Sequence, residues 1–428
     1  MDYRENVQSD DSIAVDYEID RNVIDNKTYS DADIHPFKDM NLFVIQLESV
    51  QNFVIDLKYK DDYLMPYTQV LLNDPNTFYF TNAHTSVGLG NTSDAEFAFN
   101  TGIYPLGDNT IAWDAYDDLF DINSIPKLFN ANYNCYSYNP TIESFYAHKY
   151  IHEKLYCFDK FSGFETFEKT YSYATNQSLY LGEKWVSDTS ILSLCTLDAS
   201  KSLKQGKNFY IFTETITPHY PFLDLSDKYD NYTNLIFDQL DSKFNNYLSQ
   251  IHQNDKIIYD AIIHATEILP NTLFILYGDH GNTLSIDSYE KLFGVKLTDL
   301  EYRKLLLEVP FIFYDPSGQL LQYCLDTGVD LDKMTNKVCS QVDLFKTICC
   351  LYGLEANSYG INLFSNEPSF AIDPKNLDII TDSFIYSLKN NDYEVFSEID
   401  YNRMIDIIVR IKKFKLMSDR HLAYIIGR

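Results

Sequence analysis

The chain has 428 residues, of which 45% are hydrophobic and 22% charged, so it can bury a sizeable core and lacks the composition of a disordered protein. Sixty-two acidic residues against 34 basic ones give a formal charge of −28, which argues against nucleic acid as a partner because most of the surface would repel a polyanion. A small phosphate ester stays compatible with this charge, since a metal ion or a helix N-terminus dominates the field at short range.

Cysteine usage and hydropathy place further bounds on the chain. Its seven cysteines include no C-x-x-C pair, which predicts neither a zinc knuckle nor a complete disulfide framework. No segment has the ~18 consecutive apolar residues of a membrane span. The N-terminus "MDYRENVQSDDS" is acidic where a signal peptide would be basic. We expect a soluble chain, and the sequence fits a whole gene product and an excised ectodomain equally.

Residues 1–40 are polar and acidic, which predicts an N-terminal arm or linker. From Asn41 onward, short apolar runs alternate with longer helical stretches, the pattern of an α/β fold with a mostly parallel sheet sandwiched by helices. We expect this main domain to cover 41–365. The predicted strands are 42–47, 77–82, 133–139, 208–215, 272–278 and 309–315. The predicted helices between them include 178–200 and 233–269, of which the second is expected to be two helices.

The pattern changes after Gly353 to short alternating pieces. "SFIYSLKNNDYEVF" predicts a hairpin centred on Asn390 and Asn391, and "YNRMIDIIVRIKKF" predicts a terminal helix. We therefore expect a small C-terminal α+β subdomain over 366–428.

Three of the predicted strands end near residues that can bind a metal ion. Glu48 follows the first strand, Asp279 and His280 follow the fifth, and His219 stands shortly after the fourth. Ligands of open α/β sheets bind beyond the carboxyl ends of the strands, and mixed carboxylate and imidazole sets bind manganese, magnesium or zinc. Each residue also has a purely structural interpretation, since a carboxylate at a strand end often caps a helix, and Asp-His after glycine fits a polar turn.

The stretch "VGLGNTSDAEF" contains the pattern of a helix start. Ser93 and Glu96 match the capping box S-x-x-E, with Ser93 as the N-cap. Thr92 would then lie just outside a helix N-terminus, where unpaired N–H groups and the helix dipole favour an anion. A capping box needs no catalysis, so a purely structural role explains the stretch as well. A reactive Thr92 would need a base or a metal ion, because a free hydroxyl is a poor nucleophile.

Five motifs taken in order, "IQLESVQNF", "GLGNTSDAEF", "TPHYPF", "LYGDHGN" and "SQVDLFKTICCLYG", resemble the lipoteichoic acid synthase family within the alkaline phosphatase and sulfatase superfamily. The resemblance spans roughly residues 40–365 and implies a sulfatase-like catalytic domain. It implies that Thr92 is the nucleophile and a ligand of manganese, and that Glu48, Asp279 and His280 are the remaining ligands. It also implies that His219 contacts the phosphate or the leaving group.

The same resemblance implies a metal-dependent phosphoglycerol transferase. Such an enzyme moves glycerol phosphate from phosphatidylglycerol to a growing polymer or a glycolipid through a phospho-threonine intermediate. The implied cofactor is Mn²⁺, with Mg²⁺ or Zn²⁺ as alternatives. The implied location is the extracellular face of the cell membrane, as the soluble ectodomain of a membrane-anchored protein that works at the membrane surface in cell wall biogenesis.

The chain departs from the family pattern at two places. Asn91 stands where a lysine usually precedes the threonine. The family's tryptophan and arginine for the headgroup fall in "ESFYAHKYIHEKLYCFDKF", where the nearest equivalents are Phe145 or Tyr146 and His148 or Lys149. We therefore predict Tyr146, His148 and Lys149 as substrate-binding residues, although lysine lacks the bidentate fork of arginine. An amphipathic helix packed on the sheet explains this segment as well.

Two other functions are compatible with the same residues. A phosphodiesterase or phosphatase of the superfamily would resolve the covalent intermediate with water. A catalytically silent homologue would keep the fold and bind glycerol phosphate. A formylglycine sulfatase is disfavoured, because the nucleophile position lacks the C/S-x-P-x-R pattern that this chemistry needs.

Overall fold

The central sheet is built from the apolar runs that the sequence predicts as strands. The computed structural model describes residues 23–427 apart from 26, 28, 171–179 and 183. Its largest sheet has the strand order β4-β12-β11-β1-β10-β6-β7. The strand bounds are β1 Asn41–Leu47, β4 Thr77–Phe80, β6 Tyr133–Tyr138, β7 Lys160–Ser162, β10 Asn208–Glu214, β11 Thr272–Gly278 and β12 Phe311–Tyr314. All six predicted strands are present, and β7 is an addition.

The sheet is mostly parallel and covered on both faces. Strand β1 pairs in parallel with β10 and β11, whereas β12 runs antiparallel to β11 and β4. Every residue of β1 and β11 is buried, which explains why these runs are apolar without alternation. Alternate β1 residues face two cores, with Val44 in one and Ile45 in the other.

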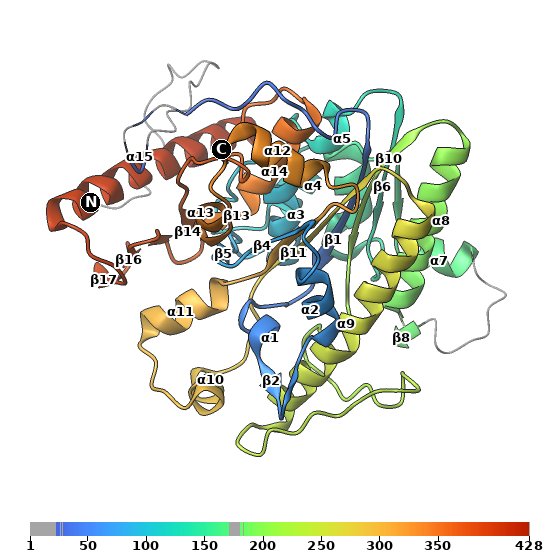
Figure 1. Ribbon diagram of the computed structural model, residues 1–428, viewed down its shortest axis with the longest axis horizontal. Helices are drawn as coiled ribbons and strands as arrows, with labels where there is room; N and C mark the ends of the chain where they lie inside the picture. Colours follow the sequence, from blue (N-terminus) through green and yellow to red (C-terminus); the bar gives the residue numbers. More distant parts are fainter. Residues whose placement is uncertain (1–22, 26, 28, 171–179, 183, 428) are drawn as a thin grey trace.

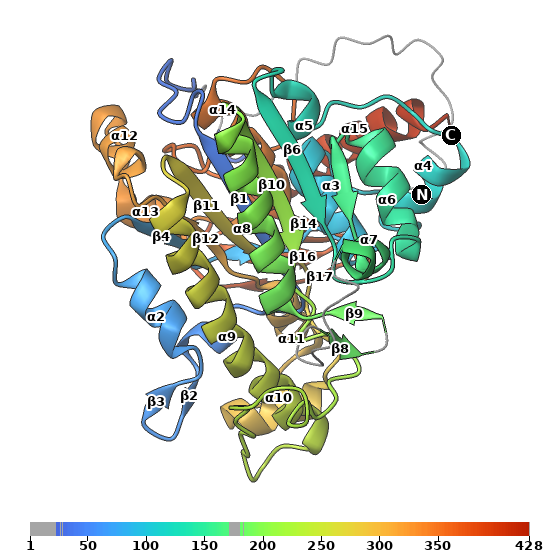
Figure 2. The same ribbon diagram turned by 90° about the vertical axis from the view of Figure 1, so that its right-hand side faces the viewer.

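Helices form a layer on each face of this sheet (Figures 1 and 2). Helices α8 (Asp188–Lys204) and α9 (Ser242–Ile268) lie side by side on one face, and α3 (Thr92–Thr101) packs with α14 (Gln341–Tyr352) on the other. The remaining helices of the main body are α1 Phe53–Asp56, α2 Pro66–Leu72, α4 Ile111–Asp117, α5 Ile125–Leu128, α6 His148–Tyr150, α7 Phe164–Thr170, α10 Ile286–Phe293, α11 Asp299–Leu307, α12 Gln319–Thr327 and α13 Leu331–Asn336. Three two-stranded pairings join β2 (Lys58–Tyr59) to β3 (Asp62–Tyr63), β5 (Ala83–His84) to β13 (Cys339–Ser340), and β8 (Tyr180–Gly182) to β9 (Trp185–Val186).

Both long predicted helices begin later than the sequence pattern indicated. The prediction for 178–200 is wrong in its first part, because β8 and β9 form a hairpin there, while 178 and 179 lie outside the described residues. Ser187 caps α8 by accepting a hydrogen bond from the backbone N–H of Ser190. The prediction of two helices over 233–269 is also wrong: α9 is a single helix, capped by Asp241. In both cases the helix starts where a side chain satisfies its first-turn N–H groups.

The C-terminal region forms a second, antiparallel sheet and a long helix. The strands are β14 Ala371–Asp373, β15 Asp378–Ile380, β16 Phe384–Ser387 and β17 Asp392–Val395. The predicted hairpin joins β16 to β17, and Asn391 has a φ of 52°, which asparagine tolerates in such turns. Helix α15 (Tyr401–Ile425) extends beyond the predicted segment. Among the described residues, no helix combines the length and the apolarity needed to cross a bilayer.

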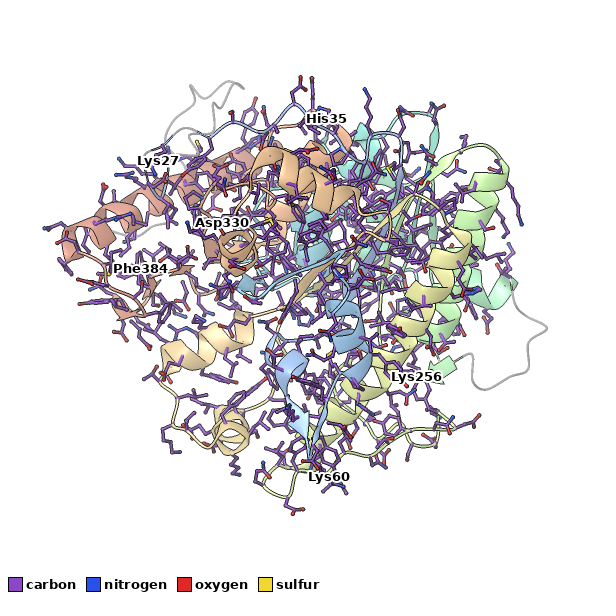
Figure 3. The ribbon with its side chains drawn as sticks, in the orientation of Figure 1. Lys27, His35, Lys60, Lys256, Asp330 and Phe384 are labelled. Carbon is purple, nitrogen blue, oxygen red and sulfur yellow. The ribbon has the colours of Figure 1, made fainter. Side chains whose placement is uncertain are left out.

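The N-terminal residues that the structure describes lie against α14. The backbone N–H of Phe37 donates to the carbonyl oxygen of Leu351 at 3.0 Å. The ring of His35, labelled in Figure 3, lies with Nδ1 2.7 Å from the carbonyl oxygen of Cys350. Most of the predicted arm precedes these contacts, in the part of the chain outside the described residues.

Candidate active site

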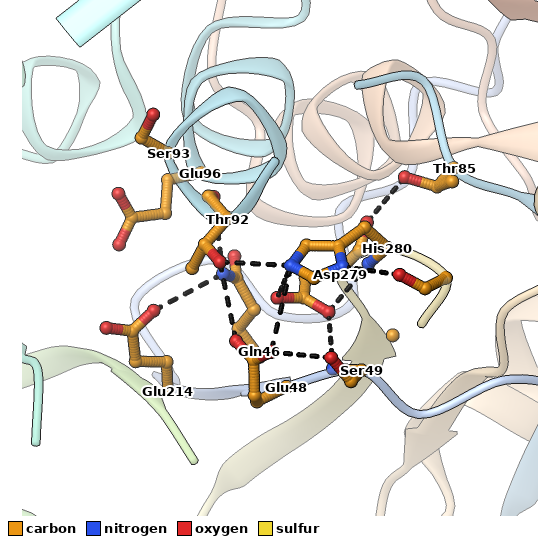
Figure 4. A network of polar contacts seen from close by, with 12 residues as sticks. Gln46, Glu48, Ser49, Thr85, Thr92, Ser93, Glu96, Glu214, Asp279 and His280 are labelled. Carbon is orange, nitrogen blue, oxygen red and sulfur yellow. Dashed lines mark hydrogen bonds and ion pairs between the residues drawn. The ribbon is translucent and has the colours of Figure 1, made fainter. Parts of the chain in front are cut away.

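Four side chains converge at the carboxyl edge of the central sheet. Leu47 and Gly278 are paired at the ends of β1 and β11, so Glu48 and Asp279, the next residues, emerge side by side. Figure 4 shows Thr92 pointing toward the imidazole of His280 and toward Glu48. Parallel neighbouring strands bring their carboxyl ends to one edge, and the first residue of α3 meets them there.

The distances between these groups are short. Thr92 Oγ1 lies 3.1 Å from His280 Nε2 and 3.4 Å from Glu48 Oε2. His280 Nε2 lies 3.3 Å from Asp279 Oδ2 and 3.7 Å from Glu48 Oε1. One potential ligand atom from each of Glu48, Asp279 and His280 lies within 4.8 Å of the other two.

Neighbouring backbone groups orient these ligands. His280 Nδ1 is 2.8 Å from the carbonyl oxygen of Gly281, so Nδ1 carries a proton that it donates there, and Nε2 faces Thr92. Asp279 Oδ1 accepts the backbone N–H groups of Ser49 at 2.8 Å and His280 at 2.6 Å. Asp279 Oδ2 is buried and has no hydrogen-bond partner in the described part of the chain.

The electrostatics of the site show two crowded carboxylates beside an imidazole. Burial and the charge of Glu48 raise the pKa of Asp279 well above its ordinary range. Burial alone would also raise the pKa of Glu48, but the charges on His280 and His219 and the Ser49 hydroxyl lower it. Burial opposes protonation of His280, yet the two carboxylates raise the pKa of its ring.

This donor set fits a divalent cation. Two carboxylates, an imidazole Nε2 and a hydroxyl form the mixed oxygen and nitrogen set that binds zinc or manganese. Asp279 Oδ2 accepts no hydrogen bond from the described residues, and the backbone groups that orient Asp279 and His280 are interactions typical of metal sites. A bound cation would relieve the repulsion between Glu48 and Asp279.

The predicted capping box at the start of α3 is wrong. The helix begins at Thr92 itself, preceded by Asn91 with a φ of 44° and no capping side-chain hydrogen bond. Ser93 lies in the first turn, and its Oγ donates to the carbonyl oxygen of Gly90 at 3.1 Å. Glu96 is buried within the fold and does not reach back to the helix start.

Asp94 takes over the role expected of the capping box. Its buried carboxylate accepts the backbone N–H groups of Gly88 at 2.9 Å and Gly90 at 3.0 Å. Burial raises the pKa of Asp94 to about 6. A Cβ on Gly90 would collide with this carboxylate, so only glycine allows the loop to pass this close to α3. The side chain of Asp94, in the first turn of α3, thereby holds the loop that precedes Thr92.

Glu96 has partners that local sequence could not indicate. Its Oε2 lies 3.2 Å from His152 Nε2 and 3.5 Å from His148 Nε2, and all three side chains are buried. The charges of the two histidines outweigh burial and lower the pKa of Glu96. This buried cluster anchors α3 one turn after Thr92.

The predicted headgroup segment is an irregular turn between β6 and β7. His148 is buried against Glu96, and Lys149 forms an ion pair with Glu143 at 2.7 Å. Tyr146 is half-buried and packs beside Trp113, with ring centroids 6.1 Å apart. In the described part of the chain, this segment forms no regular amphipathic helix. None of the three residues contacts Thr92 there.

His219 lies in the loop that follows β10. Its Nδ1 is 2.5 Å from the carbonyl oxygen of Tyr220, and its ring packs on Trp185 with centroids 5.1 Å apart. The charge of His219 lowers the pKa of Glu48, after the larger effects of burial and His280. His280 lines a cavity of about 210 Å³, and His219 lines a separate one of about 360 Å³ that none of the four converging side chains lines.

Comparisons with known proteins agree with this architecture. The sulfatase family model matches residues 40–354. Lipoteichoic acid synthase 2 of Bacillus subtilis (strain 168) is 26% identical over 399 residues, which cover 89% of this chain and 56% of that protein. The chain thus spans about half the length of this relative.

Two solved structures have the same fold. The crystal structure of the lipoteichoic acid synthase LtaP from Listeria monocytogenes matches with a TM-score of 0.75 at 20% identity, covering 92% of this chain and 96% of that chain. The phosphoglycerol transferase GacH of Streptococcus pyogenes, in complex with sn-glycerol-1-phosphate, matches with a TM-score of 0.52 at 11% identity, covering 91% and 87%. The expected α/β fold is confirmed, and the chain belongs to the sulfatase family.

Proposed function

We propose that the chain is the catalytic part of a metal-dependent phosphoglycerol transferase. It would move glycerol phosphate from phosphatidylglycerol to a growing polymer or a glycolipid through a phospho-threonine intermediate. The observation that carries this proposal is the position of the Thr92 hydroxyl, 3.1 Å from His280 Nε2 at the first residue of α3. The similarity to lipoteichoic acid synthase 2 supports the choice of substrate class.

Glu48, Thr92, Asp279 and His280 would hold the metal ion, with Mn²⁺ as the first candidate and Mg²⁺ or Zn²⁺ as alternatives. When bound, such a cation lowers the pKa of a ligating hydroxyl and stabilises negative charge on a phosphate. The preorganised geometry around His280 and Asp279 keeps the ligands in place for it.

The chain's own residues account for the transfer. Thr92 Oγ1 gives up its proton to solvent and attacks the phosphorus, and the bond between phosphorus and the diacylglycerol oxygen breaks. An acceptor hydroxyl then attacks the same phosphorus and returns a proton to His219, and the bond between phosphorus and Thr92 Oγ1 breaks. The N-terminus of α3 faces the phosphate and stabilises its charge. The Nδ1–H of His219 donates a hydrogen bond to the carbonyl oxygen of Tyr220. Nε2 is then the ring nitrogen that holds the proton taken by the departing oxygen. Tyr146, His148 and Lys149 are the residues proposed to bind the headgroup. His148 lies in an ion-pair contact with Glu96 and Lys149 in one with Glu143, so Tyr146 is the most available of the three.

Replacing Thr92 with alanine tests this proposal. The Thr92→Ala variant should fold normally and release no diacylglycerol from phosphatidylglycerol in the presence of Mn²⁺. Ser93→Ala is the matched control, because this neighbouring hydroxyl only contacts the carbonyl oxygen of Gly90 in the same loop. Unchanged diacylglycerol release by Thr92→Ala would refute the proposal.

Product analysis distinguishes transfer from hydrolysis. With a glycolipid or polymer acceptor present, the proposed transferase gives an extended acceptor. Free glycerol phosphate as the sole product, with and without acceptor, would indicate a phosphodiesterase of the same superfamily. The proposed substrate also implies work at the extracellular membrane surface, with residues 1–40 as the linker, 41–365 as the catalytic domain and 366–428 as a subdomain.

A further inference from the structure

The cavity that His280 lines joins the candidate site to the C-terminal antiparallel sheet. It has a volume of about 210 Å³, and its wall includes Asn91, which directly precedes Thr92. The same wall includes Lys375, which lies in the turn between β14 and β15. The apolar part of the lining consists of Val87, Leu306 and Leu307. One of the four converging side chains and a lysine of the C-terminal sheet therefore face one space.

Two glycines pack the β14–β15 turn against the loop that precedes Thr92. Gly107 has a φ of 92°, and a Cβ there would lie 2.1 Å from the carbonyl oxygen of Pro374. A Cβ on Gly88, in the loop that Asp94 holds, would lie 2.6 Å from the Cα of Gly107. A side chain at either position would push these segments apart. The close packing gives the turn a fixed place beside the candidate site.

The turn is held from within by Asp373, and Lys375 projects from it. The Oδ1 of Asp373 accepts the backbone N–H of Lys375 at 2.9 Å, and its Oδ2 accepts the side-chain amide of Asn376 at 2.7 Å. Asp373 is 2% exposed, whereas the side chain of Lys375 is exposed. Within the described part of the chain, the Lys375 ammonium forms neither an ion pair nor a hydrogen bond.

The charges around the cavity leave Lys375 as its uncommitted cation. Arg303 also lines the cavity, but its Nε donates to the buried carboxylate of Asp378 at 2.6 Å. Asp373 is the only carboxylate among the described residues of the lining, and both of its oxygens accept hydrogen bonds within the turn. The exposed Asp108 is close in sequence to this packing but does not line the cavity. An anion in the cavity would therefore meet a lysine that no carboxylate neutralises.

The wall also contains a hydrogen-bond donor that the protein does not satisfy. Asn282 lines the cavity and is 7% exposed, and its Oδ1 accepts the backbone N–H of Leu284 at 2.9 Å. Its Nδ2 has no hydrogen-bond partner among the described residues. Because buried polar groups normally have partners, this donor favours a ligand with acceptor oxygens.

We propose that the cavity beside His280 binds a phosphate group of the substrate and that Lys375 pairs with this group. The inference rests on the proposed function, because transfer of glycerol phosphate brings phosphate groups of both the donor and the acceptor to the site. Asn91 leaves the position before Thr92 without charge, so the C-terminal sheet supplies the positive charge instead. Lys375 acts by its charge, and no covalent bond forms or breaks at its nitrogen.

Replacing Lys375 with methionine tests the inference, and the variant should fold because this side chain is exposed. The substrates are dioleoylphosphatidylglycerol in dioleoylphosphatidylcholine vesicles and a glycerol phosphate polymer as acceptor. One of the two KM values should rise about tenfold, because a hydrogen bond to a charged group contributes about that factor. A higher KM for phosphatidylglycerol assigns the bound phosphate to the donor, and a higher KM for the polymer assigns it to the acceptor. Unchanged KM values for both substrates would overturn the inference.

Two further variants separate the charge of Lys375 from a general effect of the C-terminal sheet. Lys375→Arg keeps a positive charge and should leave both KM values within about threefold of the wild type. Lys389→Met is the matched control, because Lys389 is an exposed lysine in the β16–β17 turn of the same sheet and does not line the cavity. An equal rise in KM for Lys389→Met and Lys375→Met would contradict a specific phosphate contact.

A binding measurement keeps this test separate from the test of the proposed function. Isothermal titration calorimetry with sn-glycerol-1-phosphate, in the presence of MnCl₂, should give a dissociation constant about tenfold larger for Lys375→Met than for Lys389→Met. This difference in a protein that does not turn over phosphatidylglycerol would refute the proposed function and leave the phosphate site standing. Equal dissociation constants for the two variants, or no binding by the wild type, in an active enzyme would refute the phosphate site alone.

Discussion

Replacing Asp279 with asparagine should remove the response to manganese without destabilising the metal-free protein. Burial and the nearby Glu48 charge raise the pKa of Asp279 well above its ordinary range, because an ionised Asp279 would be poorly solvated and would be repelled by Glu48. Asparagine keeps an Oδ1 that can accept the N–H groups of Ser49 and His280. It removes the carboxylate that Glu48 would repel when ionised and, at the same time, a proposed ligand of the cation.

The expected effect of the metal on thermal stability follows from the size of the chain. A ligand present at 100 times its dissociation constant stabilises the folded state by about 2.7 kcal/mol. The entropy of unfolding is about 2.1 cal/mol/K per residue, or about 0.9 kcal/mol/K for 428 residues. The unfolding midpoint of the wild type should therefore rise by about 3 °C on saturation.

Differential scanning calorimetry of chelator-treated protein, with and without MnCl₂, checks both parts of this prediction. Asp279→Asn without metal should unfold at or above the wild-type temperature and should not respond to Mn²⁺. Asp326→Asn is the matched control, because Asp326 is exposed on α12 and should leave the rise intact. A wild type that ignores Mn²⁺, or an Asp279→Asn variant that rises as much as the wild type, would refute the reasoning.

Three further changes probe the stability and the chemistry of the chain. Arg303→Met should lower the free energy of unfolding by about 3–5 kcal/mol, because it leaves the fully buried carboxylate of Asp378 without the guanidinium that donates to it at 2.6 Å. Urea unfolding checks this loss, and most of it should be recovered when Asp378→Asn is added. Burial, assisted by Lys304, lowers the pKa of His84 to about 3, so below pH 6.5 the unfolded chain gains a proton that the folded chain does not. The wild type should therefore lose up to ~1.4 kcal/mol of stability per pH unit relative to His84→Gln as the pH falls from 6.5 toward 3, and a pH-independent difference between the two would contradict this. His219→Gln should slow turnover of phosphatidylglycerol by about 10²- to 10⁴-fold. Turnover of a water-soluble glycerol p-nitrophenyl phosphodiester should fall far less, because nitrophenolate leaves without a proton. Equal losses on the two substrates would argue against His219 as the proton donor.

The sequence by itself determined the central sheet and the neighbourhood of the ligands. Strands such as β1 and β11 are continuous apolar runs, and a parallel sheet covered on both faces requires that pattern. Because neighbouring parallel strands end at one edge, the sequence alone predicts that Glu48, Asp279 and His280 lie together. Helix starts were harder to predict, since periodicity alone did not separate the β8–β9 hairpin from α8.

Only the tertiary structure decided what the polar residues of α3 do. The pattern of Ser93 and Glu96 predicts a capping box from local spacing, but a buried carboxylate must find partners, and His148 and His152 arrive from a distant turn. Glu96 therefore points into the fold, and Asp94 holds the loop before Thr92 instead. The cavity beside His219 is likewise formed by segments that are separate in sequence. Such contacts depend on how the chain folds back on itself, which local sequence patterns do not encode.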